Sequence, residues 1–231
     1  MCNVLSNAIN SYHTIPIKGC NEIRFSNGGH LFACVYAEKN VNLYNFYTGE
    51  TTETMSFIGH QARVMSIDWF ANDMGFTTCG LDGNIYFYDL YQPQLEPGKR
   101  NIPKDKYRRN VQLSSVVNLP GHPYEFIAVG DEKIILTFTD KLKSIPRQTS
   151  VTEAIQTVPV LPELKHHLSQ LVIHHSGKIL FAGVGELGDP YPGAIQVWKL
   201  PFEKAAEIQA HASPVTRLRI SNTNTHLFSV G

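Results

Sequence analysis

The stretch Val64-Met-Ser-Ile-Asp-Trp-Phe-Ala-Asn-Asp-Met-Gly-Phe-Thr-Thr-Cys-Gly80 holds a short apolar run, a polar turn and a second short run that ends in a small residue. Similar stretches begin at Ile23, Val111, Leu171 and Val215. The second runs end at Val35, Gly80, Gly130, Gly183 and Gly231. By subtraction, successive copies lie 45, 50, 53 and 48 residues apart. Repeats of about 40–45 residues, lengthened by loop insertions, are typical of four-stranded propeller blades.

The residues between these landmarks predict β-strands. Residues 41–47 and 85–90 are short β-branched and aromatic runs with alternating character, bounded by Gly, Asn or Asp. Asp82-Gly83 between two such runs predicts a tight type I′ hairpin turn. Residues 203–211 contain good helix formers, but the repeat register assigns them to an outer strand. The predicted class is therefore all-β, a β-propeller.

The repeat register also predicts the organisation of the chain. The predicted segments are a lead-in (1–18), blades at 19–58 and 59–98, a basic insertion (99–110), a diverged blade (111–165), a blade at 166–210 and the first half of a truncated blade (211–231). The second copy shows no clear fourth strand, because residues 91–103 are rich in Pro, Lys and polar residues. About four and a half blades would leave sheet edges exposed. We therefore expect a partial propeller, completed by another propeller portion in cis or in trans.

Dipeptides at equivalent places in the copies sharpen this prediction. Gly59-His60 and Ala210-His211 precede two copies, and Tyr88-Asp89 and Trp198-Lys199 end third strands. With these signatures the sequence resembles the WD-repeat propeller superfamily. The resemblance implies a hydrogen-bonded structural set within a blade. In this chain it would consist of His60, Thr78, Asp82 and Tyr88, with Trp198 and His211 in the matching places of later copies.

A narrower resemblance rests on longer segments. Ile17-Lys-Gly-Cys-Asn-Glu-Ile-Arg-Phe-Ser-Asn-Gly-Gly-His-Leu-Phe-Ala33 is similar to the opening of the second propeller of the cilia- and flagella-associated protein 57 family. Three further segments agree in order: Gly59 to Asp68, Ile173 to Gly183 and Ile208 to Thr216. The resemblance covers about residues 16 to 231, with residues 90–165 diverged. It implies a non-catalytic scaffold in the axoneme of a motile cilium or flagellum, on the cytoplasmic side.

The same resemblance implies partners. They would be the doublet microtubule, inner dynein arms and subunits of the dynein regulatory complex. This chain lacks the first propeller and the coiled coil that the family carries. The alternative function is a general cytoplasmic WD-repeat adaptor, for instance in ubiquitin ligation or trafficking.

One charged segment stands out in a chain with 20 basic and 20 acidic residues. Its basic residues, opposed only by Asp105, are Lys99, Arg100, Lys104, Lys106, Arg108 and Arg109. A run of charges in a loop is commonly a solvated surface. The functional alternative is a contact with an acidic partner, for which tubulin is the candidate under the ciliary resemblance.

Other classes of function find no support in the sequence. A net charge of zero argues against nucleic-acid and membrane-surface binding, and no apolar run reaches the length of a membrane span. The Gly183-Val-Gly185-Glu-Leu-Gly188 motif is followed by a proline-rich stretch instead of the helix that a dinucleotide site needs. The histidine pairs 166–167 and 174–175 show no convergent metal-ligand pattern. We predict no enzyme, no cofactor and no metal. Four scattered cysteines indicate a reducing compartment.

Overall fold

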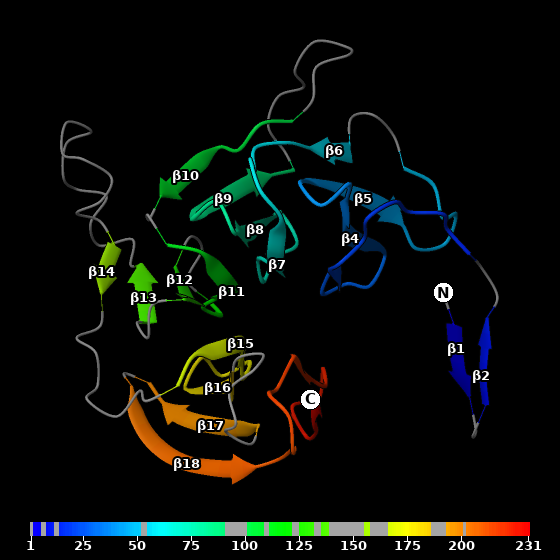
Figure 1. The fold of residues 1–231 in the computed structure, drawn as a ribbon. Helices are drawn as coiled ribbons and strands as arrows, with labels where there is room; N and C mark the ends of the chain where they lie inside the picture. The colour runs from blue at the N-terminus through cyan, green and yellow to red at the C-terminus, as the bar shows by residue number, and fades with distance from the viewer. Residues whose placement is uncertain are drawn as a thin grey trace, which may run out of the picture.

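The computed structural model of the chain describes residues 2–5, 8–11, 14–51, 55–90, 101–108, 111–121, 125–131, 135–138, 155–157, 166–185, 193–200 and 202–231. The elements in these ranges are β-strands paired in antiparallel sheets. The predicted all-β class is confirmed. Figure 1 shows five of the sheets arranged around a common centre, as the blades of a propeller are.

Four of these sheets are complete blades of four strands. Blade 1 contains β3 (Ile23–Phe25), β4 (Leu31–Tyr36), β5 (Asn40–Asn45) and β6 (Ser56–Phe57). Blade 2 contains β7 (Val64–Trp69), β8 (Gly75–Gly80), β9 (Asn84–Asp89) and β10 (Asp105–Arg108). Blade 3 contains β11 (Leu113–Asn118), β12 (Phe126–Gly130), β13 (Ile135–Phe138) and β14 (Ile155–Thr157). Blade 4 contains β15 (Leu168–Ile173), β16 (Ile179–Val184), β17 (Ala194–Lys199) and β18 (Glu203–Gln209).

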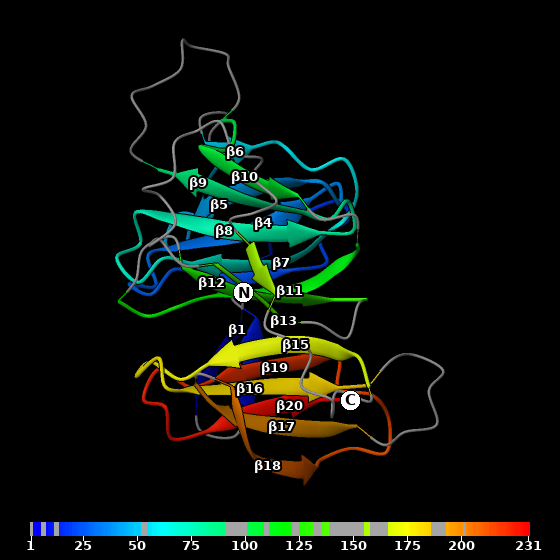
Figure 2. The same ribbon diagram turned by 90° about the vertical axis from the view of Figure 1, so that its left-hand side faces the viewer.

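Among the residues that the structure describes, two sheets have two strands each. The half-blade consists of β19 (Arg217–Ile220) and β20 (Leu227–Val230), and the N-terminal hairpin consists of β1 (Cys2–Leu5) and β2 (Ala8–Ser11). In each blade the strands pair in chain order. Figure 2 shows this for blade 4, where β15, β16, β17 and β18 follow one another outward. The structure is thus a partial propeller of four blades and a half-blade.

Two expectations about blade 2 need correction. Blade 2 was expected to have no clear fourth strand. It has one, because β10 pairs with β9 from Asp105↔Phe87 to Arg108↔Asn84. Lys106 and Arg108 therefore belong to an outer strand and not to an insertion. Charged residues are common there because they discourage pairing with another edge.

The hairpin at Asp82-Gly83 also differs from the prediction. Three residues, 81–83, join β8 to β9, and only Gly83 among them has a positive φ, of 71°. The Gly83 N–H donates to the Gly80 carbonyl at 3.1 Å. Three-residue hairpin loops place a single left-handed residue last, and Gly fills that position without steric strain. The Asp82 carboxylate accepts the Asn84 N–H at 3.1 Å, which stabilises this loop in place of a type I′ turn.

The core lies between neighbouring blades and not within one. Between blades 1 and 2, Val35 and Leu43 pack with Ile67, Trp69 and Phe76. Similar apolar clusters fill the next two blade interfaces, and a smaller one joins blade 4 to the half-blade. Fully burying one such side chain contributes about 1.5–3 kcal/mol. Each blade is therefore stabilised largely by its neighbours.

Candidate functional site

Three members of the predicted structural set of blade 2 lie together: His60, Thr78 and Asp82. The His60 Nδ1 atom is 3.0 Å from Asp82 Oδ1, and its Nε2 atom is 2.8 Å from Thr78 Oγ1. Burial alone would raise the pKa of Asp82. Hydrogen bonds from His60, Asn84 and the Gln61 N–H outweigh that effect and hold the pKa well below its usual range. The carboxylate is therefore charged and fully engaged inside the blade.

The other residues of the predicted set have different contacts. Tyr88 is buried, and its hydroxyl donates to the Ile58 carbonyl at 3.4 Å. In the half-blade, His211 Nε2 lies 2.8 Å from Ser229 Oγ, with the sequence separation of 18 that His60 and Thr78 also have. Trp198 is 1% exposed and belongs to the cluster between blades 3 and 4, where no described residue accepts a hydrogen bond from its indole N–H.

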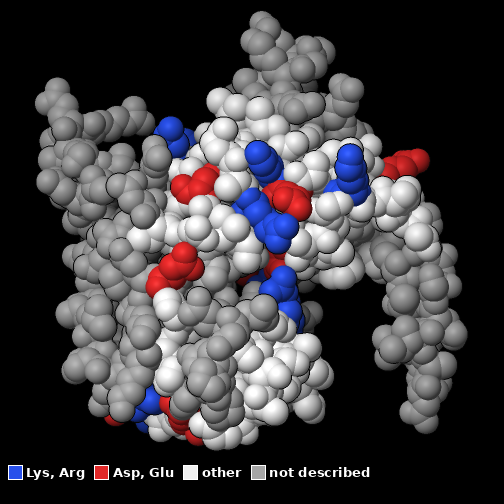
Figure 3. Space-filling view, in the orientation of Figure 1, with Lys and Arg blue, Asp and Glu red and all other residues white. Residues whose placement is uncertain are grey.

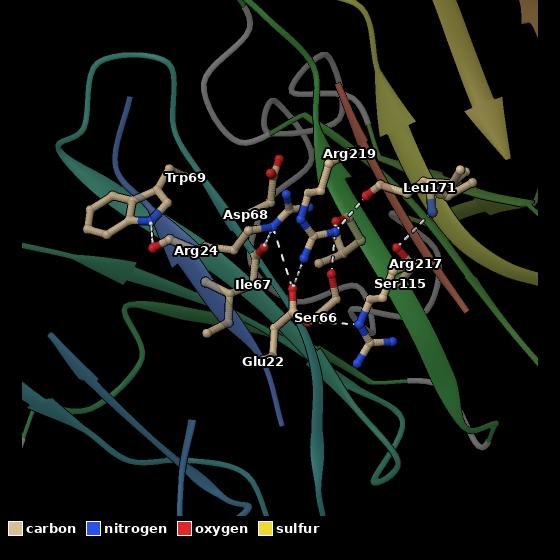
Figure 4. Close-up of polar contacts among 12 residues, drawn as sticks. Glu22, Arg24, Ser66, Ile67, Asp68, Trp69, Ser115, Leu171, Arg217 and Arg219 are labelled. Carbon is tan, nitrogen blue, oxygen red and sulfur yellow. Dashed lines mark hydrogen bonds and ion pairs between the residues drawn. The ribbon is translucent and has the colours of Figure 1, made fainter. Parts of the chain in front are cut away.

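An ion cluster that the sequence reasoning missed lies where the half-blade meets blade 1 (Figure 4). The Glu22 side chain is 1% exposed, and its Oε1 atom is 2.8 Å from Arg219 Nη2 and 3.5 Å from Arg24 Nε. Arg217 Nε is 3.7 Å from Oε2, and Arg217 Nη2 donates to the Asn21 carbonyl at 3.2 Å. Three cations thus surround one buried carboxylate.

The cluster changes the acidity of its members. The pKa of Arg219 is lowered to about 10, chiefly by burial and in part by the neighbouring charge of Arg24, while Glu22 opposes both effects. Burial raises the pKa of Asp68 on β7, which Arg24 and the Asn118 N–H partly offset. Figure 3 shows charged side chains of both signs around the hollow at the centre of this face. A cavity of about 460 Å³ there is lined by residues of the first strands of all five sheets, including Arg24, Asp68 and Ile220.

Polar contacts run around all five first strands. Blade 1 contacts blade 2 through Arg24 Nε, which donates to the Ile67 carbonyl at 3.0 Å. Between blades 2 and 3, Ser66 Oγ donates to the Val116 carbonyl. Between blades 3 and 4, the Leu171 N–H donates to Ser115 Oγ. Between blade 4 and the half-blade, Ser169 Oγ donates to the Val215 carbonyl. The hydrogen bond from Arg219 to Glu22 joins the half-blade to blade 1. These contacts therefore link the five first strands, or the residues just before them, in a circle around the centre.

Away from that circle, blade 1 and the half-blade have faces that no other sheet in the described part of the chain covers. We call these two faces the seam. The pairing of the first strand with the second defines equivalent positions in the five sheets. Ile23 of blade 1 is equivalent to Ile67, Val116, Leu171 and Leu218 in the other four. The last four are 0% exposed, whereas Ile23 is 47% exposed.

The half-blade shows the same effect. Phe228 and Val230 are 60% and 59% exposed, and their counterparts Thr77 and Cys79 in blade 2 are 0% exposed. The seam is thus a pair of apolar blade faces, with Arg217 and Arg219 at the inner end of one of them.

The structure describes only some of the basic residues that were singled out in the sequence. Lys99, Arg100 and Arg109 lie outside the described residues. Lys104 Nζ forms an ion pair with Asp89 Oδ2 at 3.1 Å, and Lys106 is exposed on β10. The glycine motif at 183–188 runs out of the described part of the chain after Gly185.

Other site types can be judged only for the described residues. Within those ranges no three His, Cys, Asp or Glu residues are grouped so that they could hold a metal ion. No helix within them has the length and apolarity to cross a membrane.

Comparison with known proteins agrees with this geometry. The WD domain, G-beta repeat family matches residues 51–89, which include most of blade 2. The β-propeller domain in the crystal structure of Myceliophteria thermophila Cps50 (Swd1) superposes with a TM-score of 0.71 at 18% identity, covering 95% of this chain and 64% of that one. This likeness shows the fold.

Two relatives match along the whole chain. Cilia- and flagella-associated protein 57 A of Tetrahymena thermophila is 30% identical over 256 residues, and the Mus musculus cilia- and flagella-associated protein 57 is 28% identical over 235 residues. Both alignments cover 100% of this chain. The chain belongs to the cilia- and flagella-associated protein 57 family. It spans only 19% and 16% of the length of these two relatives.

This membership bears on three expectations. The predicted family and the WD-repeat propeller are confirmed. The names of the relatives support the expected localisation in a cilium or flagellum. The repeat fold together with these relatives points to a scaffold type of protein and not to a catalyst.

The ion cluster at the seam had a signal in the sequence. Aligned by strand pairing, Glu22 and Arg24 of blade 1 and Arg217 and Arg219 of the half-blade occupy the same two positions. Blades 3 and 4 have only uncharged residues there: Ser115, Val117, Gln170 and Val172. Comparing the copies position by position would have found charges concentrated in the first and last of them.

Proposed function

We propose that this chain is part of a non-catalytic axonemal scaffold that helps dock inner dynein arms or dynein regulatory complex components on the doublet microtubules of motile cilia. The observation that carries the proposal is the seam. Its apolar residues occupy positions that are buried between sheets in the other blades, so they are suited to a protein contact. The kinship with cilia- and flagella-associated relatives supplies the setting.

The seam also supports the proposal that another propeller portion packs here, in cis or in trans. Both faces of the seam expose large apolar side chains: Ile23 and Phe25 on blade 1, and Phe228 and Val230 on the half-blade. Burying them against a further sheet would restore the environment that their counterparts have in blades 2 to 4.

A matched pair of variants tests the role of the seam. Ile23→Ser changes a seam residue that is 47% exposed, and Ile102→Ser changes a residue that is 54% exposed before β10 in blade 2. Tagged chains carrying each change are expressed in ciliated cells, and retention in salt-extracted axonemes is measured. We expect Ile23→Ser to reduce retention severalfold and Ile102→Ser to leave it unchanged, with similar thermal midpoints for both.

The outcome also separates the scaffold from its alternative. Equal retention of both variants would remove the seam from the interaction. A diffuse cytoplasmic signal of the unaltered chain in ciliated cells would contradict the axonemal function and favour the general adaptor.

We also propose that the basic residues near β10 contact an acidic partner such as the tubulin surface. Lys106 is exposed on β10, the outer strand of blade 2, and the sequence has Lys104 and Arg108 two positions before and after it. Changing Lys104, Lys106, Arg108 and Arg109 to Glu should weaken co-sedimentation with doublet microtubules. Rising salt should have the same effect on the unaltered chain, because exposed charges are screened beyond about 8–10 Å. Binding that ignores both changes would contradict the contact.

A further inference from the structure

One pair of residues in blade 1 carries chemistry that the seam does not use. Asn27-Gly28 is the only Asn-Gly pair in the sequence, and both residues are exposed in the loop between β3 and β4. An asparagine followed by glycine can deamidate without an enzyme, because glycine has no side chain to hinder attack of its backbone nitrogen on the asparagine amide. The rate of this reaction depends on how tightly the two residues are held.

A carboxylate of the next blade holds this loop. The Asn27 N–H and the Asn27 side-chain amide both donate to Asp73 Oδ1 at 2.8 Å, and the Gly28 N–H donates to Asp73 Oδ2 at 2.7 Å. The same side-chain amide donates to the Phe70 carbonyl at 2.8 Å. Asp73 and Phe70 lie in the loop between β7 and β8. Four hydrogen bonds thus tie the loops of blades 1 and 2 together.

We propose that Asn27-Gly28 is a deamidation site that Asp73 restrains, and that the modification proceeds when the loops of blades 1 and 2 separate. In the reaction the Gly28 nitrogen attacks the Asn27 Cγ atom. The proton of the Gly28 nitrogen and the side-chain NH₂ of Asn27 leave together as ammonia. The resulting succinimide adds one water and opens to aspartate or to isoaspartate. The net change is the uptake of one water and the release of one ammonia.

The contact with Asp73 opposes each part of this reaction. The Gly28 nitrogen must give up the proton that it donates to Asp73 Oδ2, and the negative charge that it then carries would lie next to a carboxylate. The Asn27 side-chain nitrogen must leave, which breaks its hydrogen bonds to Asp73 and to the Phe70 carbonyl. Hydrogen bonds to a charged acceptor are the stronger kind. The closed contact therefore slows deamidation.

A second pair of loops shows that this bridge does not need a charge to form. In four of the loops the first residue donates its N–H to the carbonyl five positions later: Ser26, Phe70, His174 and Ser221. Counted from these residues, His175 is equivalent to Asn27, and Asn224 is equivalent to Asp73. Asn224 Oδ1 accepts the His175 N–H at 3.3 Å, and both acceptor residues have a positive φ, 57° for Asn224 and 55° for Asp73. Asparagine therefore fits this position, and Asp73→Asn should keep the fold.

Deamidation would turn an attractive contact into a repulsive one. Aspartate or isoaspartate at position 27 would place a second carboxylate where an amide now donates to Asp73, and it would offer no donor to the Phe70 carbonyl. Like charges at such short range repel each other. Asn27 also lines the central cavity, so the new charge would lie at its wall. The modification would therefore loosen the join between blades 1 and 2 beside the cavity.

Peptide mapping by mass spectrometry tests the restraint. The unaltered chain, Asp73→Asn and the control Glu38→Gln are incubated folded at neutral pH, and deamidation at position 27 is followed over time. Glu38 also bridges blades 1 and 2, through its ion pair with Arg63 at 3.0 Å, but it lies outside the two loops. We expect Asp73→Asn to deamidate severalfold faster than the unaltered chain, and Glu38→Gln to deamidate at the unaltered rate.

The unaltered chain in urea gives the rate without any restraint, and we expect it to exceed the rate of the folded chain severalfold. Equal rates in the folded and the unfolded chain would overturn the proposal. An unchanged rate in Asp73→Asn would remove Asp73 from the restraint. A lower rate in that variant would show that Asp73 assists the reaction as a base, which is the opposite of the proposal.

Hydrogen exchange tests the effect of the modification on the two blades. Asn27→Asp reproduces one product, and the control Asn222→Asp adds the same charge at the equivalent loop position of the half-blade, which lines the same cavity. We expect the amides of Gly28 and Asp73 to exchange severalfold faster in Asn27→Asp than in the unaltered chain, and to be unaffected in Asn222→Asp. Unchanged exchange in Asn27→Asp would contradict the loosening of the join.

Discussion

Blade 2 and the half-blade are formed by similar stretches of sequence but lie in different surroundings. Both pair their first two strands in the same register, and both place a histidine against a hydroxyl 18 residues later. In blade 2 a sheet packs on each face, so the second strand is buried throughout. In the half-blade the same strand exposes Phe228 and Val230. Local sequence therefore sets pairing, whereas burial depends on which sheet comes next.

The largest expected effect comes from replacing isoleucine in the two surroundings, between blades and at the seam. Ile67→Ala in blade 2 removes a side chain that is 0% exposed, and should lower the free energy of unfolding by about 2–5 kcal/mol. Ile23→Ala, at the aligned position on the seam, should cost less than about 1 kcal/mol, because that side chain is half exposed and its loss leaves no closed cavity. Urea denaturation of both variants measures the difference. Equal losses would mean that the seam is filled in the isolated chain.

A smaller effect distinguishes the complete hydrogen-bonded set from the partial one. Asp82→Ala removes the acceptor of His60 and of two backbone N–H groups, and should cost about 1–3 kcal/mol. His211→Ala, which loses only the contact with Ser229 among the described residues, should cost less. Thermal midpoints compare the two variants. No loss in Asp82→Ala would show that the repeat register does not matter for stability.

The same carboxylate predicts a pH dependence. The pKa of Asp82 is lower in the folded chain than in the unfolded chain, so the unfolded state binds the proton first as the pH falls. The contribution of Asp82 is therefore fully present above its unfolded pKa of about 4 and is lost as the pH falls through the folded value. Unfolding of Asp82→Asn and of the unaltered chain, measured from pH 7 down to acid, should converge at the acid end.

The third effect concerns the ion cluster. Glu22→Gln removes the charge that three arginines share and should cost about 1–2 kcal/mol, less than a fully buried pair because Arg217 and Arg219 are partly exposed. The control is Glu38→Gln, whose pair with Arg63 is about half exposed on both sides and should contribute less than about 0.5 kcal/mol. Hydrogen exchange of β19 amides measures the effect at the seam. Unchanged exchange in Glu22→Gln would show that the cluster does not hold the half-blade to blade 1.

The smallest expected effect is on β10. Lys106→Glu changes an exposed residue on an outer strand and should alter the free energy of unfolding by no more than about 0.5 kcal/mol. Urea denaturation measures it. A large loss would indicate that this lysine has a structural role in blade 2.

Comparison of these regions also explains what the sequence could predict. Spacing and alternation predicted the all-β class, and the repeat register predicted an outer strand at residues 203–211, which the structure has at residues 203–209. The proximity of His60 to Asp82 was implied by the resemblance to WD-repeat proteins. The fourth strand of blade 2 was missed because charged residues on an outer edge resemble a loop. The ion cluster was missed because Glu22 and Arg219 are 197 residues apart and meet only where the half-blade contacts blade 1. No single copy of the repeat reveals such a contact, and the signal appears only when the copies are compared with one another.

The pair of Glu22 and Arg219 has a consequence for the order of folding. Its partners are 197 residues apart, whereas contacts within a blade join residues a few tens of positions apart. Closing so long a loop has a high entropic cost, which is repaid only once the intervening blades have formed. The seam should therefore close after the blades, late on the folding pathway. Substitutions at Glu22 should accelerate unfolding and leave the folding rate nearly unchanged.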